Sequence, residues 1–103
     1  ADRVAQLVEE RERLFHELSR ISWLRPYPSR ANFLLCKILG EIPGGNPELS
    51  AGAALKAALF QQGIMVRYFD TPRLGDHIRI SAGRPGDTDR LLQCLTELEA
   101  GKR

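Results

Sequence analysis

The sequence is poor in the features that mark several common classes of protein. Its 103 residues include only two cysteines, Cys36 and Cys94, and neither lies in a close metal-ligand spacing. The net charge of +2 is too small to indicate binding to nucleic acid or to an anionic membrane. No apolar run is long enough to span a bilayer, and the first residues show no signal-peptide pattern. We therefore expect a cytoplasmic protein with two buried, reduced thiols and no metal site.

Two further absences concern a loop and the first residues. The glycine-rich segment 40–47 lacks the Lys-Ser/Thr and GxGxxG patterns of phosphate-binding loops, so we interpret it as a plain connection. An initiating methionine is also lacking, and a helical pattern begins at once, at Val4. These two features lead us to expect a piece of a longer polypeptide. The length is that of one domain with a modest core.

Three segments have the apolar periodicity of amphipathic helices. The first spans residues 4–18 and carries charged side chains on its opposite face. The second spans residues 50–62, is rich in alanine and leucine, and is followed by Gly63 as a C-terminal stop. The third begins at Pro85, which suits the first turn of a helix. Residues 101–103 are expected to form a frayed tail.

Three other segments are expected to form a small sheet. Segment 32–39 is apolar at nearly every position, which is typical of a strand covered on both faces. Segments 63–69 and 77–81 alternate in polarity around a polar turn, which predicts a β-hairpin. The prolines of segment 23–29 indicate an extended turn instead. The predicted order is α-β-α-β-β-α, an α+β fold whose three-stranded sheet has helices packed on one face and the strand of Arg79 at its centre.

The hairpin places two arginines side by side on the face that the helices leave open. Strand alternation directs Arg67 away from the core, and a symmetric turn places it directly across from Arg79. Opposed like charges destabilise a sheet by up to about 1 kcal/mol, and guanidinium groups do not lose their protons to relieve the repulsion. A bound phosphate or carboxylate would relieve it. Because the apolar Met65 and Phe69 share this open face, we predict an interface or ligand site there, with the two arginines as an anion clamp.

Four strings of residues resemble one enzyme family. They are Gly-Ile-Met-Val-Arg-Tyr-Phe at 63–69, Ile-Arg-Ile-Ser-Ala-Gly at 78–83, Pro-Ser-Arg-Ala-Asn-Phe at 28–33 and Thr-Asp-Arg-Leu-Leu at 88–92. With these strings at these spacings, the chain resembles the C-terminal small domain of histidinol-phosphate aminotransferase, a fold-type I pyridoxal-phosphate-dependent enzyme. The resemblance extends over nearly the whole chain.

The resemblance implies a place in a larger protein and a reaction. Residues 1–103 would be a single domain, C-terminal in a longer aminotransferase, and residues 1–22 would be the end of the helix between its domains. The full-length enzyme would transfer the amino group of L-histidinol phosphate to 2-oxoglutarate through pyridoxal 5'-phosphate, in histidine biosynthesis. The arginines that match Arg67 and Arg79 would hold the substrate phosphate and also the carboxylate of the glutamate/2-oxoglutarate partner.

The resemblance also implies that the catalytic machinery lies elsewhere. The family's Schiff-base lysine and its cofactor-holding residues belong to the large domain, and none of Lys37, Lys56 and Lys102 lies in a matching segment. We therefore expect no catalytic residue and no bound cofactor in this chain alone, which should be inactive. The expected partners are the large domain of the same polypeptide, an anionic small-molecule substrate and, for the full-length enzyme, a second copy in a homodimer. Neither nucleic acid nor a membrane is an expected partner.

Other readings of the same residues stay open at this point. The chain could be a stand-alone amino-acid-binding regulatory domain, although such a domain needs a covered sheet and a preformed pocket. A nucleic-acid module would need clustered aromatic residues and clearer basicity. Arg67 or Arg79 could also pair with Asp70, with Asp76 or with an acidic residue of another domain.

Three residues near the arginines receive lesser roles. We expect Asn32 to terminate a turn, since asparagine suits such positions. Tyr68 falls on the side that faces the helices and is expected to join the core. His77 is expected on the arginine side, at the rim of the site.

Overall fold

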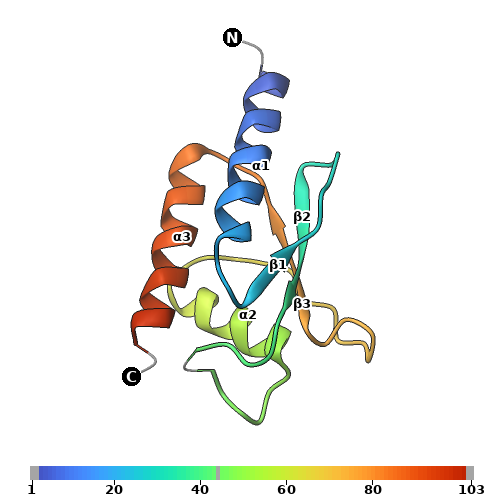
Figure 1. Cartoon of the computed structure of the whole chain (residues 1–103), viewed down its shortest axis with the longest axis vertical. Coiled ribbons are helices and arrows are strands. Elements are labelled where there is room, and N and C mark those ends of the chain that lie inside the picture. The colour runs from blue at the N-terminus through green and yellow to red at the C-terminus, as the bar shows by residue number, and fades with distance from the viewer. Residues whose placement is uncertain (1–2, 44, 102–103) are drawn as a thin grey trace.

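The computed structural model describes residues 3–43 and 45–101 (Figure 1). In chain order its elements are α1 (Arg3–Ser19), β1 (Leu24–Pro26), β2 (Phe33–Ile38), α2 (Ala51–Gln61), β3 (His77–Ser81) and α3 (Pro85–Ala100). The three predicted helices are therefore confirmed. Of the predicted tail, Gly101 caps α3, and residues 102 and 103 lie outside the described residues.

The sheet is antiparallel and has the order β1-β2-β3, which corrects two expectations. β1 lies in the segment expected to be an extended turn, and Pro26 is tolerated there because β1 is an edge strand. Segment 63–69, expected to be a strand, forms only one isolated bridge, between Arg67 and Arg79. The element order is therefore α-β-β-α-β-α rather than α-β-α-β-β-α.

On the turn side of the bridge, the backbone groups that would continue the ladder with β3 are bonded within the turn: the N–H of His77 donates to the carbonyl of Leu74 at 3.1 Å, and the carbonyl of Phe69 accepts from the N–H of Thr71 at 2.8 Å. Two further contacts join segment 63–69 to α2. The backbone N–H of Ile64 donates to the carbonyl of Leu59 at 2.9 Å. Toward the other end, the hydroxyl of Tyr68 lies 2.7 Å from that of Ser50, the N-cap residue of α2. The prediction that the strand of Arg79 is central is also wrong: β2 is the central strand, β3 is at the edge, and within the described chain only the isolated bridge to Arg67 lies beyond β3.

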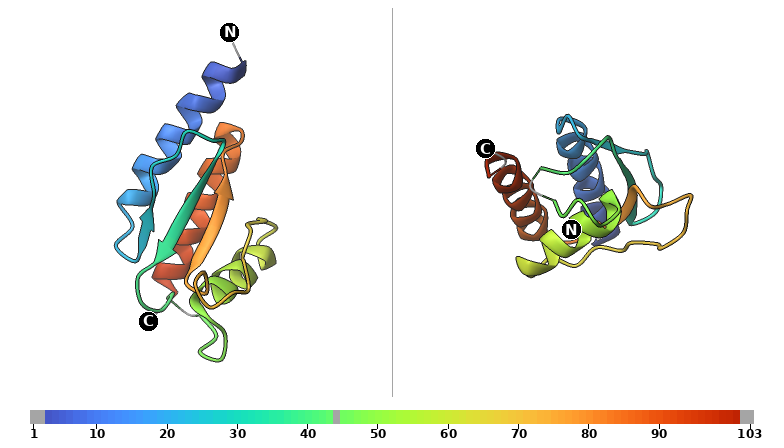
Figure 2. Two further views of the ribbon diagram at one scale, coloured as in Figure 1. Left: turned by 90° about the vertical axis from the view of Figure 1, so that its right-hand side faces the viewer. Right: turned by 90° about the horizontal axis from the view of Figure 1, so that it is seen from below.

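The predicted fold class is confirmed, because the described chain is an α+β structure with its helices on one side of the sheet. In the left view of Figure 2, β2 and β3 lie in front of α1 and α3, and no helix of the described chain covers them on the viewer's side. Along β2, Leu34, Cys36 and Ile38 are buried, whereas the side chains between them are partly exposed. The expectation that this strand is covered on both faces is therefore wrong for this chain.

The core fills the space between the sheet and the helices. Its largest fully buried side chains are Leu14, Leu18, Leu34, Cys36, Ile38, Leu55, Leu59, Ile78 and Leu95. Both cysteines are buried and unpaired, as predicted. Burial raises the pKa of the Cys36 thiol to about 12, because the thiolate would lose its hydration.

Local signals in the sequence account for the ends of α2. Ser50 precedes the helix in extended conformation, and its hydroxyl accepts a hydrogen bond from the backbone N–H of Ala53 at 3.3 Å. After the helix, Gly63 has a φ of 80°, which is the predicted glycine stop. Within the described residues, no helix has the length and apolar character needed to cross a membrane.

Candidate anion-binding site

The predicted register of the two arginines agrees with the structure. Arg67 and Arg79 form an antiparallel bridge in which each residue donates to the other: the N–H of Arg67 to the carbonyl of Arg79 at 3.0 Å, and the N–H of Arg79 to the carbonyl of Arg67 at 2.8 Å. Residues directly opposed in this way direct their side chains to the same face of the ladder. That face is the open one, because Arg79 alternates in β3 with the buried Ile78 and Ile80.

The guanidinium of Arg79 lies over two aromatic rings. Its Cζ atom lies 4.7 Å from the ring centre of Phe33 and 5.8 Å from that of Phe69. Its Nε atom is buried and makes no hydrogen bond within the described part of the chain. Contact with two rings restricts the side chain to few conformations, and the unpaired Nε leaves a donor for a ligand.

The described residues provide no carboxylate partner for either arginine. Neither Arg67 nor Arg79 takes part in any ion pair among the described residues. Asp76, one of the alternative partners, instead lies 2.8 Å from Nδ1 of His77. Two unpaired cations on one open face form a site that favours an anion.

Both arginines line a shallow hollow of about 400 Å³. Its lining consists of Lys56, Met65, Val66, Arg67, Tyr68, Arg79 and Ser81. Three of these side chains are cationic and none is acidic, so the local charge is positive although the net charge of the whole chain is only +2.

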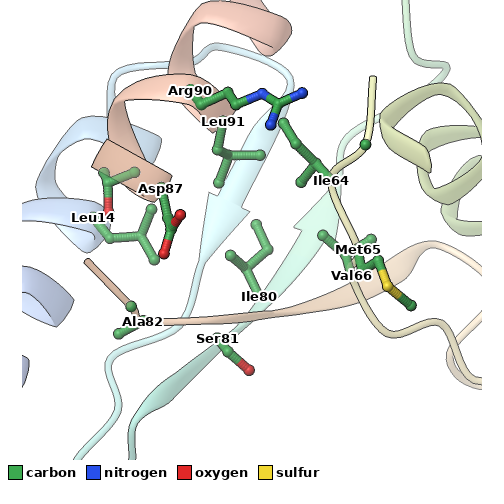
Figure 3. Close-up of a pocket in the computed structure, with 13 residues that line it drawn as sticks. Leu14, Ile64, Met65, Val66, Ile80, Ser81, Ala82, Asp87, Arg90 and Leu91 are labelled. Atoms are coloured by element: carbon green, nitrogen blue, oxygen red, sulfur yellow. The ribbon is translucent and has the colours of Figure 1, made fainter. Parts of the chain in front are cut away.

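A neighbouring hollow of about 270 Å³, shown in Figure 3, lies on the helix side of the same segment. Leu91 of α3 and Ile80 of β3 point toward its centre and give it an apolar floor. Its charged groups are already engaged: Arg90 donates to the carbonyl of Gln62, and the carboxylate of Asp87 accepts from the backbone N–H of Arg84. The arginine hollow is therefore the better candidate for binding an anion.

Other residues singled out in the sequence have structural contacts. Tyr68 faces the helices as predicted, with its ring close to Gly52 of α2, but it is only half-buried and does not join the core. The carbonyl of Asn32 accepts a hydrogen bond from the N–H of Ala82 at 2.8 Å, which is a structural role. His77 is half-buried and its ring stacks on Tyr27, with 6.1 Å between ring centres.

Sequence reasoning missed two members of the site. Phe33 supports Arg79 because β2 pairs with β3 and places Leu35 opposite Arg79, so that the open face of β2 contributes its aromatic ring. The alternation of segment 32–39 carried this signal, but the expectation of a strand covered on both faces obscured it. Lys56 reaches the hollow from α2, and its sequence position alone gives no indication of this. Within the described residues, no group of three or more His, Cys, Asp or Glu side chains could hold a metal ion.

Comparison with solved structures defines the class of protein. A putative aminotransferase from Burkholderia pseudomallei K96243 is 32% identical, with a TM-score of 0.73 over 93% of this chain and 26% of that one. Histidinol-phosphate aminotransferase from Sinorhizobium meliloti, in complex with pyridoxal-5'-phosphate, is 25% identical, with a TM-score of 0.75 over 96% of this chain and 25% of that one. The chain thus has the fold of one part of a pyridoxal-phosphate-dependent aminotransferase.

Comparison with curated proteins finds similarity to one segment of a particular enzyme. Histidinol-phosphate aminotransferase of Dehalococcoides mccartyi (strain ATCC BAA-2266 / KCTC 15142 / 195) is 46% identical over 92% of this chain and 24% of the relative's length. The chloroplastic histidinol-phosphate aminotransferase 1 of Arabidopsis thaliana is 40% identical over 88% of this chain and 20% of its own length. The chain is therefore homologous to a segment of histidinol-phosphate aminotransferase, as its motifs predicted, and it spans only 24% and 20% of the length of these two relatives. No family model matches the chain.

Proposed function

We propose that this chain is the substrate-anion-binding small domain of a histidinol-phosphate aminotransferase. In the full-length enzyme, L-histidinol phosphate gives its amino group to 2-oxoglutarate, a step of histidine biosynthesis. The observation that supports this most directly is the hydrogen-bonded pairing of Arg67 with Arg79 on the open face, without a carboxylate partner in the described chain.

In this proposal the two arginines share the work of positioning the substrate. Arg79, whose guanidinium contacts the rings of Phe33 and Phe69, offers a pre-oriented guanidinium edge to an oxyanion. Arg67 is exposed and approaches the same anion from the adjacent strand position. The pair holds the phosphate of L-histidinol phosphate in one half of the reaction and a carboxylate of glutamate or 2-oxoglutarate in the other, since both anions suit the guanidinium fork.

The cofactor is assigned to another part of the polypeptide. Pyridoxal 5'-phosphate supplies the electron sink for amino transfer when it is bound. A Schiff-base lysine is typically desolvated in an enclosed pocket, whereas Lys56 is exposed at a shallow hollow and Lys37 is half-buried in β2. The described residues therefore do not fit the cofactor, and we assign its binding to the large domain of the same polypeptide. On this proposal the isolated chain is inactive, and the full-length enzyme is a homodimer.

The open face and the start of α1 support the same assembly. Phe33, Leu35 and Phe69 are only half-buried on the open face, which the large domain would cover. Figure 1 shows the first turns of α1 extending beyond the sheet, and Val4 and Val8 there are 66% and 41% exposed. We assign residues 1–22 to the end of the helix between the domains.

A location in the cytoplasm is part of the proposal as well. The name of the relative from Arabidopsis thaliana places that protein in the chloroplast, so the compartment differs among similar enzymes.

The proposal is tested by steady-state kinetics of the full-length protein with L-histidinol phosphate and 2-oxoglutarate. Arg79→Gln should lower kcat/KM by at least about 30-fold, because removing one partner of a desolvated charge pair costs about 2 kcal/mol or more. Arg73→Gln is the matched control, since Arg73 lies in the adjacent turn and does not line the hollow. Unchanged kinetics for Arg79→Gln would exclude the clamp, and a full-length protein that does not turn over L-histidinol phosphate would exclude the assigned substrate.

A further inference from the structure

We propose that Lys56 is a third positive group of the anion site and makes it prefer a phosphate monoester over a carboxylate. The inference rests on the proposed function, because it concerns the same hollow and the same two substrates. It assigns to α2 a role in substrate specificity, in addition to its packing against β3.

The position of Lys56 follows from the way segment 63–69 runs back along α2. One contact joins the two near the end of the helix, where Ile64 donates to Leu59, and another joins them at its start, where Tyr68 meets Ser50. Lys56 lies between these two contacts, in the middle of α2. Its side chain is exposed and lines the same hollow as Arg67 and Arg79.

The charges around Lys56 are suited to a dianion. The lining of the hollow contains Lys56, Arg67 and Arg79 but no Asp or Glu. Within the described chain, Lys56 takes part in none of the ion pairs and makes no side-chain hydrogen bond. Its ammonium group is therefore available to a ligand.

The two substrates of the proposed reaction differ in charge where they meet this site. A phosphate monoester carries a charge of about −1.5 to −2 near pH 7, whereas a carboxylate carries −1. The two positive charges of the guanidinium groups exceed the single negative charge of a carboxylate. A phosphate dianion neutralises both guanidinium groups and has a third terminal oxygen that they do not contact. An ammonium on a flexible stem acts as a point charge and can reach that oxygen without requiring a planar fork.

No other lysine of the described chain has this placement. Lys37 is half-buried in β2, pairs in register with His77 and does not line the hollow. The preference for phosphate is therefore expected to depend on Lys56.

The experiment compares two half-reactions of the full-length enzyme, one with L-histidinol phosphate and one with L-glutamate. Lys56→Gln should lower kcat/KM for L-histidinol phosphate about fivefold or more, as expected for one partly solvated charge, and should change the value for L-glutamate less than twofold. Lys56→Arg should restore most of the loss, because it keeps the charge. Arg20→Gln, which removes an exposed charge at the end of α1, should leave the ratio of the two values unchanged.

The outcomes separate this inference from the proposed function. An unchanged ratio for Lys56→Gln, with large losses on both substrates for Arg79→Gln, overturns the role of Lys56 and leaves the clamp intact. Equal losses on both substrates for Lys56→Gln also overturn it, because a structural defect would affect both. If Arg79→Gln changes neither half-reaction, the proposed function itself fails, and the inference fails with it.

Discussion

A buried carboxylate between α1 and α3 offers a stability prediction that the structure makes quantitative. Glu10 is 6% exposed and accepts two hydrogen bonds from Arg13, at 3.2 Å from Nε and 2.7 Å from Nη2. Arg13 in turn reaches α3, where it lies 3.0 Å from the carboxylate of Asp89 and donates to the carbonyl of Pro85 at 3.0 Å. The group therefore ties the two helices together.

Glu10→Gln keeps the shape of this side chain and removes its charge. Gln has a single acceptor oxygen, so one of the two hydrogen bonds from Arg13 is lost and the other is made to a neutral amide oxygen instead of a carboxylate. Each change weakens the contact by about 1 kcal/mol. Arg13 still has a carboxylate partner in this variant, because its ion pair with Asp89 remains. We therefore expect the free energy of unfolding to fall by about 2 kcal/mol. Glu12→Gln is the control: its carboxylate is 62% exposed in a pair with Arg11, and its loss should cost less than about 1 kcal/mol.

The effect of Glu10 should depend on pH in a defined direction. Burial raises the pKa of Glu10. The hydrogen bonds from Arg13 and Thr88 and the charge of Arg13 together lower it by more than burial raises it, so the pKa lies below its ordinary value of 4.5. A lowered pKa in the folded state means that the stabilisation is complete above the unfolded value and is lost as pH falls through the folded value.

Urea unfolding followed by circular dichroism, at pH values from 7 down to 3, measures both expectations. The difference in unfolding free energy between the native chain and Glu10→Gln should be largest near neutral pH and should shrink below about pH 4.5. A difference that is constant over this range, or that Glu12→Gln reproduces, would refute the reasoning.

Two further predictions concern close packing and thiol burial. A Cβ atom at Gly52 would lie 2.6 Å from the ring of Tyr68 and 2.7 Å from the carbonyl of His77, so Gly52→Ala should lower the unfolding free energy by about 1–3 kcal/mol despite the better helix propensity of alanine. Gly86→Ala is the control and should not lower it, because a Cβ atom there meets nothing within 4 Å. Equal urea midpoints for the two variants would contradict this prediction. Because burial raises the pKa of the Cys36 thiol to about 12, this thiol should not react with a thiol reagent at pH 8 until the chain unfolds; rapid labelling of Cys36 in the native state would contradict its burial.

The helices and the arginine pairing could be predicted from the sequence because both depend on local patterns. Apolar periodicity, the cap at Ser50 and the stop at Gly63 define helix ends without tertiary information. Side-chain alternation and the apolar match across the turn were sufficient to pair Arg67 with Arg79. The pairing is present as one isolated bridge, although the residues on either side of Arg67 do not pair with β3.

The errors arose where tertiary contacts outweigh local pattern. β1 is only three residues long and contains Pro26, so its strand character comes from pairing with β2 rather than from its own propensity. Segment 63–69 has a clear strand pattern, yet its pairing with β3 stops at Arg67 on the turn side, because the turn uses the N–H of His77 and the carbonyl of Phe69. The inclusion of Lys56 in the site likewise depends on how α2 packs, which periodicity alone does not reveal.

A double-mutant cycle on Arg67 and Arg79 tests the central claim, that the two guanidinium groups hold one anion, most directly. The measurement is kcat/KM for L-histidinol phosphate in the full-length enzyme with Arg67→Gln, Arg79→Gln and both together. If the arginines bind the same phosphate, the loss in the double variant should differ from the sum of the single losses by about 1 kcal/mol or more. Losses that add to within about 0.5 kcal/mol, or no loss in either single variant, would contradict the claim.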